Sequence, residues 1–466
     1  MSRKLPFLLL ALVVGAGCAL GPNYKRPVVP VPDQYRGEPA GSTATSIADS
    51  KWPDLFHDET LTQLVSTALE HNFDLGIASE RVLEARAQYH ITRANEFPQL
   101  SAQAQLDAAR QSSVGSFKFL QAGTDLSATY TQAGAALSWD LDFWGRLRRL
   151  TEAARANYLA TEEGRRGVVV SLIGDVTSDY FALREADLEL EIAKSTQKIA
   201  EDNLRLVNLR HTRGAATGLD VHQAEQLLYT ATAQIASAQR EIAQYEDALS
   251  LLLGRAPGEI PRGKTLDQYG IPAGVPVGLP SALLERRPDV RQAEETLIAA
   301  NAQIGAAKAL YFPQISLTGF LGGQSRALTE LFTGPARFWS IAPSAALPIF
   351  NAGQTRAGVR FSEAQKREMV LAYQKSIYNA FKEVSDALVG YDRTREQRAQ
   401  EELLVHALSE SARLSTMRYQ GGLDSYLQVL DSERNLFQGQ LVLAQLRLGE
   451  LNSFVQLYRA LGGGWQ

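Results

Sequence analysis

Two stretches of this 466-residue chain carry the same sequence pattern. Residues 70–100 align without a gap on residues 285–315, at an offset of 215 positions. Eleven of the 31 aligned positions are identical, including Phe97-Pro98-Gln99 and Phe312-Pro313-Gln314, where ordinary composition gives roughly two or three. The match resumes at an offset of 208 with pairs such as Gly214/Gly422. A repeat of about 200 residues is too long for a solenoid unit, so the chain consists of two copies of one half-molecule.

The first residues have the pattern of an export signal. A basic start is followed by an apolar run from Leu5 to Val14 and by small residues before Cys18, the only cysteine, which excludes an intrachain disulfide. The tetrapeptide Gly15-Ala16-Gly17-Cys18 resembles a bacterial lipobox, which implies a covalent lipid on Cys18. The residue after it is Ala19 and not aspartate, which in such lipoproteins suggests sorting to the outer membrane. The alternative is an unmodified cysteine beside a signal cleavage site.

Composition argues against several functional classes. The net charge of −4 becomes −6 once Arg3 and Lys4 are removed with the signal, so nothing indicates binding to nucleic acid. The six histidines form no HExxH or other zinc pattern, and the lipobox cysteine leaves no thiol nucleophile. The three methionines form no thioether cluster for copper or silver. We therefore expect no catalytic residue, no metal site and no cofactor other than the lipid.

Each repeat is predicted to contain two strands. Proline ends the first helix of each repeat, at Pro98 and Pro313, and apolar and polar residues alternate after it. The predicted strands cover Leu100–Asp107 and Tyr130–Phe143 in the first repeat and Ile315–Leu321 and Phe338–Phe350 in the second. Alternation over about ten residues suits a membrane barrel strand, with lipid on one face and water on the other. A half-buried strand of a soluble protein has the same pattern.

Four strands cannot close a barrel. The smallest bacterial barrels have about eight strands, and an open sheet in lipid leaves backbone groups without partners. A membrane location therefore requires an oligomer that shares one barrel, and both a dimer and a trimer satisfy this condition. Aromatic residues lie in or near the predicted strands, where an aromatic girdle is expected: Phe117, Phe119, Tyr130, Trp139, Trp144, Phe338 and Trp339.

A long helix without strong breakers follows each pair of strands. The two helices are predicted over about 146–213 and 354–420, and about 67 residues give a rod on the order of 100 Å. Apolar residues recur every seven positions, as in Val169/Val176/Leu183/Leu190, Ile192/Ile199/Leu206 and Leu430/Phe437/Ala444/Leu451/Tyr458. Two stripes on one helix indicate coiled-coil neighbours on both sides, as in the wall of a tube. An ordinary helical bundle is the alternative. Gly214 and Gly422 mark the reversals after these helices.

These features divide the chain into five segments. Residues 1–17 form the signal peptide and 18–57 an irregular lipidated segment. The first repeat covers 58–255 and the second 281–466. The intervening 256–280 is rich in proline and glycine and is predicted to lie beside the helices as a connection.

The order of the motifs resembles one family. A lipidated cysteine followed by GPNYKRP, then WPDLFHDETL, the two repeats, RYQGGLDSYLQVLDSERNLF and the ending LGGGW is similar to the TolC/OprM outer-membrane efflux channels of the lipoprotein branch. The resemblance covers residues 18–466. It implies an α+β membrane protein: a homotrimer with a shared twelve-stranded barrel in the outer membrane and a long α-helical periplasmic tunnel. It also implies a periplasmic adaptor and an inner-membrane pump, of the resistance-nodulation-division (RND) type, as partners.

The resemblance also assigns roles to residues near the tips of the long helices. Leu427 and Asp431 align with the family's periplasmic gate, and their spacing of four puts them on one helical face. Some members have a second aspartate where this chain has Gln428. Asp220 aligns with an aspartate that latches neighbouring helix pairs, and Arg418 and Tyr419 with its partners. Gly214 and Gly422 match the turns that meet the adaptor.

The function implied is passive conduction of substrates through a gate that opens on assembly with the pump. Two alternatives stay open. The first is an outer-membrane conduit for type I polypeptide secretion, which has the same fold and an ATP-hydrolysing pump. The second is a periplasmic coiled-coil scaffold that does not conduct, which would keep the heptads without the strands.

Overall fold

The computed structural model describes residues 19–37, 46–110, 112, 127–270 and 275–465. Cys18, Phe117 and Phe119 lie outside the described residues. The helices are α2 (Pro53–Phe56), α3 (Glu59–His71), α4 (Phe73–Ala94), α5 (Arg146–Thr212), α6 (Gly218–Leu252), α7 (Leu283–Arg286), α8 (Pro288–Ala309), α9 (Gln354–Gln420) and α10 (Tyr426–Ala460). The strands are β1 (Gln99–Arg110), β2 (Ser127–Leu141), β3 (Gln314–Ser325) and β4 (Arg337–Ala346).

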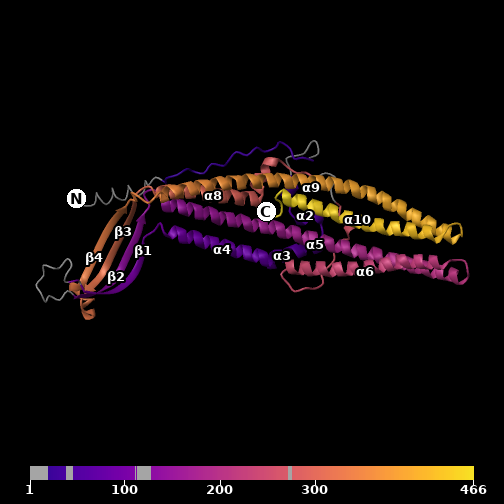
Figure 1. The fold of residues 1–466 in the computed structure, drawn as a ribbon, viewed down its shortest axis with the longest axis horizontal. Helices are drawn as coiled ribbons and strands as arrows, with labels where there is room; N and C mark the ends of the chain where they lie inside the picture. Colours follow the sequence, from indigo (N-terminus) through magenta and orange to yellow (C-terminus); the bar gives the residue numbers. More distant parts are fainter. Residues whose placement is uncertain (1–18, 38–45, 111, 113–126, 271–274, 466) are drawn as a thin grey trace. The chain divides into compact units, whose positions relative to one another are not determined.

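The four predicted strands are present and form one antiparallel sheet in the order β1-β2-β3-β4 (Figure 1). Each repeat contributes one hairpin, and β2 pairs with β3 to join the two repeats. The last strand ends at Ala346, earlier than predicted, and Phe350 beyond it is exposed. Because proline lacks an amide hydrogen, Pro348 suits a position just after the strand.

The duplication is visible in the lengths of the helices. The long helices α5 and α9 each have 67 residues, and the helices that follow them, α6 and α10, each have 35. These lengths confirm the long helices predicted from the absence of breakers. The α5–α6 and α9–α10 pairs are helical hairpins that reverse at short turns (Figure 1).

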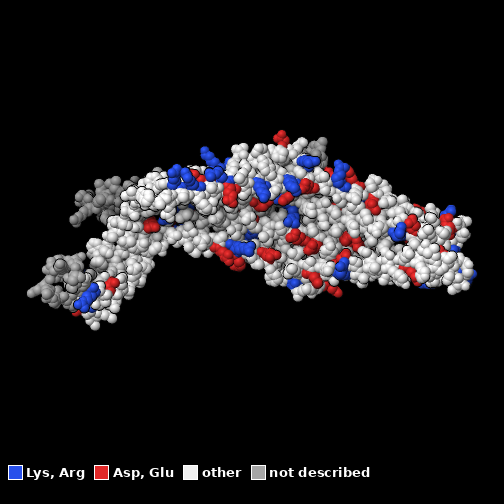
Figure 2. Space-filling view, in the orientation of Figure 1, with Lys and Arg blue, Asp and Glu red and all other residues white. Residues whose placement is uncertain are grey.

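The chain divides into two compact units, and each unit takes segments from both repeats. The first unit comprises 1–27, 82–160 and 293–373 and contains the sheet. The second comprises 28–81, 161–292 and 374–466. Over the strands the surface carries few charges, whereas the helices carry both signs (Figure 2). The two compact units therefore do not coincide with the two sequence repeats, because each unit is assembled from both copies.

In the second unit, the buried residues of α5 differ in one respect from the heptads predicted from the sequence. Val176 and Leu183 are fully buried as predicted. Ile199, also predicted as a seam residue, is 41% exposed in the single chain, so it is not part of the seam within this chain, and a seam with a neighbouring chain stays a prediction. The buried seam of α5 here is a heptad of smaller residues: Ala186, Ala193, Ala200 and Val207. Ala193 packs against Phe437 and Leu441 of α10, because a small side chain leaves room for the large ones opposite.

Two irregular segments are hydrogen-bonded to the helices. In the first unit, Arg149 of α5 donates to the carbonyl oxygens of Leu20 and Gly21, at 3.1 and 3.5 Å. Gly21 has a φ of 97°, and a Cβ there would lie 2.4 Å from the Cα of Gly305 on α8. In the second unit, Arg184 of α5 donates to the carbonyl of Lys264 at 2.9 Å. The connection between the repeats thus contacts α5 at Lys264.

Candidate functional site

The strand register puts most of the apolar residues of the sheet on one face. One row across the sheet runs from Leu100 through Leu137 and Gly319 to Ile341, and each of these residues is directly opposite the next. Because side chains alternate along a strand, this register fixes both faces. The apolar face carries Leu100, Ala102, Ala104 and Leu106 of β1, Ala133, Ala135, Leu137 and Trp139 of β2, Ile315, Leu317 and Leu321 of β3, and Trp339 and Ile341 of β4.

This apolar face is open in the single chain, and the opposite face is mainly polar, although Tyr130, Phe320 and Phe338 lie on it. Leu100 is 75% exposed and Trp339 is 70% exposed. The polar face carries Ser101, Gln103 and Gln105 of β1, and Ser316 and Ser344 join β3 to β4 through a hydroxyl contact of 2.8 Å. A sheet with one apolar and one polar face, neither covered, matches a wall between lipid and water. β1 and β4 form its edges, and their outer backbone groups require strand partners in an apolar medium.

The two helical hairpins end in the same type of turn. Gly214 and Gly422 both have a φ of 74°. In the first hairpin the amide of Ala215 donates to the carbonyl of Arg210 at 2.8 Å, and in the second the amide of Leu423 donates to that of Arg418 at 3.0 Å. This is a Schellman motif, which needs a left-handed residue after the helix and therefore favours glycine. A Cβ on either glycine would meet nothing within 4 Å, so these turns are exposed at the ends of the hairpins.

Equivalent arginines before the two turns have different partners. Arg418 forms an ion pair with Asp424 of its own turn, with Nε 2.5 Å from Oδ2. Arg210 occupies the matching position in the first hairpin, where the residue corresponding to Asp424 is Ala216. Its guanidinium instead donates to the carbonyls of Tyr419 and Gln420, both at 3.1 Å, and lies 4.3 Å from the centre of the Tyr419 ring. Arg210 therefore joins the two hairpins.

The residues predicted to latch the helices do not contact one another within this chain. Asp220 closes a capping box at the start of α6, where its Oδ2 accepts from the amide and hydroxyl of Thr217 at 2.7 and 2.8 Å. The Tyr419 ring packs edge-on against Tyr426, with centroids 5.4 Å apart. Each predicted latch residue thus has partners in its own chain: Thr217 for Asp220, Asp424 for Arg418, and Arg210 and Tyr426 for Tyr419.

The two predicted gate residues share an exposed face near the start of α10. Leu427 is 51% exposed. Asp431 lies one turn further on and accepts from Arg434 at 3.1 Å and from Asn435 at 3.3 Å. The opposite face of this turn is buried, because Tyr426, Val429 and Leu430 pack in a cluster with residues of α5, α6 and α9. Leu427 and Asp431 are therefore held on a fixed surface of the helix.

A buried carboxyl group lies two residues beyond Asp431. Glu433 is buried, and this burial raises the pKa of its carboxyl. Burial likewise raises the pKa of the neighbouring Tyr426 phenol. Glu433 corresponds in the repeat to Glu225, which is paired with His222 on the surface of α6 at 2.8 Å. The second hairpin therefore has a more buried polar interior near the gate residues than the first.

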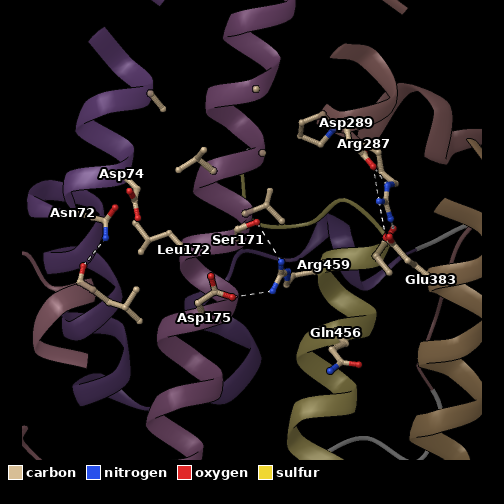
Figure 3. A pocket seen from close by; sticks show the side chains of 18 of the residues that line it. Asn72, Asp74, Ser171, Leu172, Asp175, Arg287, Asp289, Glu383, Gln456 and Arg459 are labelled. Atoms are coloured by element: carbon tan, nitrogen blue, oxygen red, sulfur yellow. Dashed lines mark hydrogen bonds and ion pairs between the residues drawn. The ribbon is translucent and has the colours of Figure 1, made fainter. Parts of the chain in front are cut away.

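A cavity of about 1060 Å³ lies in the second unit between the starts of α4 and α8, the middle of α5 and the end of α10 (Figure 3). Arg287 donates to both oxygens of Asp289, at 2.9 and 2.7 Å, and to Glu383 at 2.7 Å. It also donates to the carbonyl of Ala460 at the end of α10, at 2.9 Å. Across the cavity, Arg459 pairs with Asp175 at 3.1 Å.

The repeat explains the arrangement of this cavity. Asn72 is the counterpart of Arg287, and it donates to the carbonyl of Leu252, the counterpart of Ala460, at 3.0 Å. Both side chains thus hold the end of one helix against the start of another. The lining charges of both signs largely pair among themselves, so the cavity is a joint between helices rather than a site for one class of ligand.

Sequence reasoning missed Arg210. The sequence shows that Arg210 aligns with Arg418 and that its own turn lacks an aspartate. It does not show which distant segment lies near Arg210 and supplies its partner. In the described part of the chain, no three His, Cys, Asp or Glu residues are placed to hold a metal ion. No helix within the described ranges has both the length and the apolar character needed to cross a membrane.

A family model for "outer membrane efflux protein" matches the chain twice, over residues 64–255 and 279–463. The two matches begin 215 residues apart and end 208 apart, which are the offsets found within the sequence. Together they cover most of the chain, so this similarity extends through both repeats.

Individual proteins are similar over the full length. The solvent efflux pump outer membrane protein SrpC of Pseudomonas putida is 40% identical over 99% of this chain and 98% of its own. The cation efflux system protein CusC of Escherichia coli O6:H1 is 37% identical over 100% of this chain and 99% of its own. The solved open state of the Neisseria gonorrhoeae MtrE outer membrane channel has a TM-score of 0.86 and 32% identity, covering 96% of this chain and 99% of that one.

Proposed function

The chain belongs to the outer membrane efflux protein family, and we propose that it is the exit channel of a tripartite efflux pump. It has the α+β fold of the family's outer-membrane channels, as expected from the sequence. In this proposal it conducts substrates passively from a periplasmic adaptor and an inner-membrane pump to the exterior. The observation that carries the proposal is the exposed apolar face shared by all four strands, with an open edge at β1 and at β4.

Three copies of the chain share one barrel in this proposal. Four strands from each chain give twelve, and β1 of one chain pairs with β4 of the next, which satisfies the edge groups in lipid. Exposed aromatic residues such as Trp339 lie where a girdle contacts the lipid interface. The remaining helices of the three chains line a periplasmic tunnel.

The gate is formed by Leu427 and Asp431 of the three chains. Their exposed position on α10 supports an apolar ring next to an anionic ring on the channel axis. Three carboxylates on one axis repel each other, so other contacts must hold the gate closed. We assign these contacts to Arg210 within each chain and to Asp220 with Arg418 or Tyr419 between chains. Both bonds from Thr217 to Asp220 end on Oδ2, which leaves Oδ1 available to accept from a neighbouring chain.

The ends of the molecule contact other components. The exposed Gly214 and Gly422 turns bind the adaptor, and the pump beneath is of the RND type. A lipid on Cys18 anchors the chain in the membrane, and the hydrogen bonds of Arg149 to residues 20 and 21 support a fixed position of this segment beside the sheet. The relatives named for solvent and for cation efflux are almost equally similar, at 40% and 37% identity, which supports selection of the substrate upstream of this channel.

Two measurements test the proposal separately. Chemical cross-linking in mild detergent should stop at three subunits, and a stable conducting monomer would contradict the shared barrel. In planar bilayers the wild-type channel should be nearly closed, and Asp220→Asn with Arg418→Gln should raise its conductance. Asparagine at 220 can still accept the cap bond from Thr217, so this variant removes charge without removing the cap.

Arg205→Gln is the matched control for these recordings, because Arg205 is an exposed arginine of α5 whose loss should leave conductance unchanged. A double variant no more open than wild type would show that the gate is elsewhere, whereas a trimer that never conducts would favour a scaffold. Co-purification of the adaptor and pump from native membranes tests the partners. Recovery of an ATP-hydrolysing pump would favour polypeptide secretion.

A further inference from the structure

Two carboxyl groups are buried together in the wall formed by α5, α6 and α10. Glu185 and Glu189 lie one turn apart on α5 and are 6% and 4% exposed. Carboxylates are almost never buried to this degree unless a cation neutralises them. Neither residue belongs to the proposed gate, the turns or the cavity of Figure 3.

The neighbouring helices direct hydrogen-bond donors to Glu189 but not to Glu185. Gln234 of α6 donates to Oε2 of Glu189 at 2.9 Å, and Gln445 of α10 donates to its Oε1 at 3.4 Å. Amide donors favour the ionised form of the carboxyl that accepts them. By contrast, Oε1 of Glu185 is buried without a hydrogen-bond partner. The packing therefore stabilises a charge on Glu189 and leaves Glu185 as the unfavourable member of the pair.

Within the described residues, no cation pairs with Glu185. Its titratable neighbours are Glu189 on α5 and Glu241 and Tyr245 on α6, all of which are neutral or negative. The nearby arginines are engaged elsewhere: Arg184 and Arg262 pair with Asp187, and Arg240 pairs with Glu241. On α10, Arg447 and Glu450 pair with Glu402 and Arg398 of α9.

From this arrangement we propose that Glu185 and Glu189 share one proton, which fastens α6 and α10 to α5, and that its loss loosens both helices. With the proton on Glu185, its hydroxyl donates to Glu189, and the Glu189 charge is held by Gln234 and Gln445. Without the proton, two negative charges face each other in a buried seam, and separation of the helices or entry of water relieves the repulsion. The chain thereby responds to the pH around its helices.

The titration range follows from the same environment. Burial, then the charge and hydrogen bond of Glu189, then the charge of Glu241, raise the pKa of Glu185 to about 8. The folded chain therefore keeps the proton of Glu185 up to about pH 8, whereas the unfolded chain releases it near pH 4.5. The contribution of this proton to the free energy of unfolding is complete below about pH 4.5, declines as the pH rises, and is lost above about pH 8.

The decisive measurement compares the full-length protein with Glu185→Gln, which keeps the shape and removes the proton. In wild type, amide hydrogen exchange around Gln234 and Gln445, corrected for intrinsic rates, should rise severalfold between pH 6 and pH 9. Glu185→Gln should abolish this rise. Glu191→Gln is the matched control, since it removes an exposed glutamate from the same helix. Parallel pH profiles for wild type and Glu185→Gln would overturn the proposal.

A second measurement detects the proton directly. Infrared spectra of protein with isotope-labelled glutamate should show a carboxyl signal that loses its proton between about pH 7 and pH 9 and that is absent from Glu185→Gln, which separates it from the buried Glu433. Loss of every glutamate proton below about pH 6, or the same signal in Glu185→Gln, would refute the shared site. Glu189→Gln removes the neighbouring charge and should move this titration to lower pH. Neither readout requires conduction, so the outcome is independent of the channel proposal.

Discussion

Removal of the Arg210 side chain should open the channel more than removal of Arg418. Near the turns, Arg210 of α5 joins the two hairpins, through two carbonyls at 3.1 Å and the face of Tyr419 at 4.3 Å. Two bonds from a charged donor and one cation–π contact, discounted for partial exposure, amount to about 1–3 kcal/mol. Arg210→Ala should therefore shift the equilibrium between closed and separated hairpins by about 5- to 150-fold.

The assay combines conductance with a distance measurement. Cys18 is the only native cysteine, so spin labels can be introduced at the exposed positions Thr212 and Gln420, one on each hairpin. The distance distribution between the labels should broaden and lengthen in Arg210→Ala, and bilayer conductance should rise with it. Arg210→Lys should give an intermediate result, because one ammonium group cannot reproduce the planar fork.

Arg418→Ala is the internal comparison. Its ion pair with Asp424 lies within one turn, so its loss should disturb that turn without separating the hairpins of the same chain. If the label distances in Arg210→Ala remain those of wild type, Arg210 does not hold the hairpins together. If Arg418→Ala opens the channel as strongly, a contact between chains dominates closure.

Three further predictions concern the lipid, the turns and the seam. Cys18→Ser should remove the acyl mass seen by intact mass spectrometry, and an unmodified wild-type protein would refute lipidation; acyl chains contribute about 0.8 kcal/mol per buried methylene to anchoring. Gly254→Ala should strongly destabilise the fold in thermal melts, since its φ is 69° and a Cβ would lie 2.2 Å from the carbonyl oxygen of His71. Gly214→Ala, with a similar φ and open space, should cost only about 1–2 kcal/mol, and equal losses would contradict this difference. Ala193→Leu should overpack the contact with Phe437 and cost about 1–3 kcal/mol, whereas Ile199→Leu on the exposed side should have little effect on the melting temperature.

The strands show which features of the sheet follow from the local sequence and which depend on the tertiary structure. Alternation after Pro98 and Pro313 located β1 and β3 correctly, because a period of two is a property of each strand alone. Whether the four apolar faces coincide is not a local property. The register that puts Leu137 between Leu100 and Gly319 aligns them, and a shift of one residue would have moved one strand's apolar side chains to the polar face.

The seam of α5 illustrates where sequence periodicity misleads. Heptads of isoleucine and leucine were more conspicuous than heptads of alanine, yet Ile199 is exposed and Ala193 and Ala200 are buried. Hydrophobicity ranks a large side chain above a small one, but packing depends on the space left by the opposing helix. Phe437 fills that space, and only the folded structure reveals that it does.

By itself the sequence determined the duplication, the two long helices, the four strands and the glycine turns, because each follows from repetition, periodicity or backbone freedom within a short stretch. Only the tertiary structure decided that Arg210 binds the second hairpin while its counterpart Arg418 binds its own turn. It also decided that Glu185 and Glu189 are buried together, with no paired cation among the described residues. The physical reason is the same in both cases: the free energy of a charged side chain depends on the groups that other segments bring near it, and those segments lie far away in the sequence.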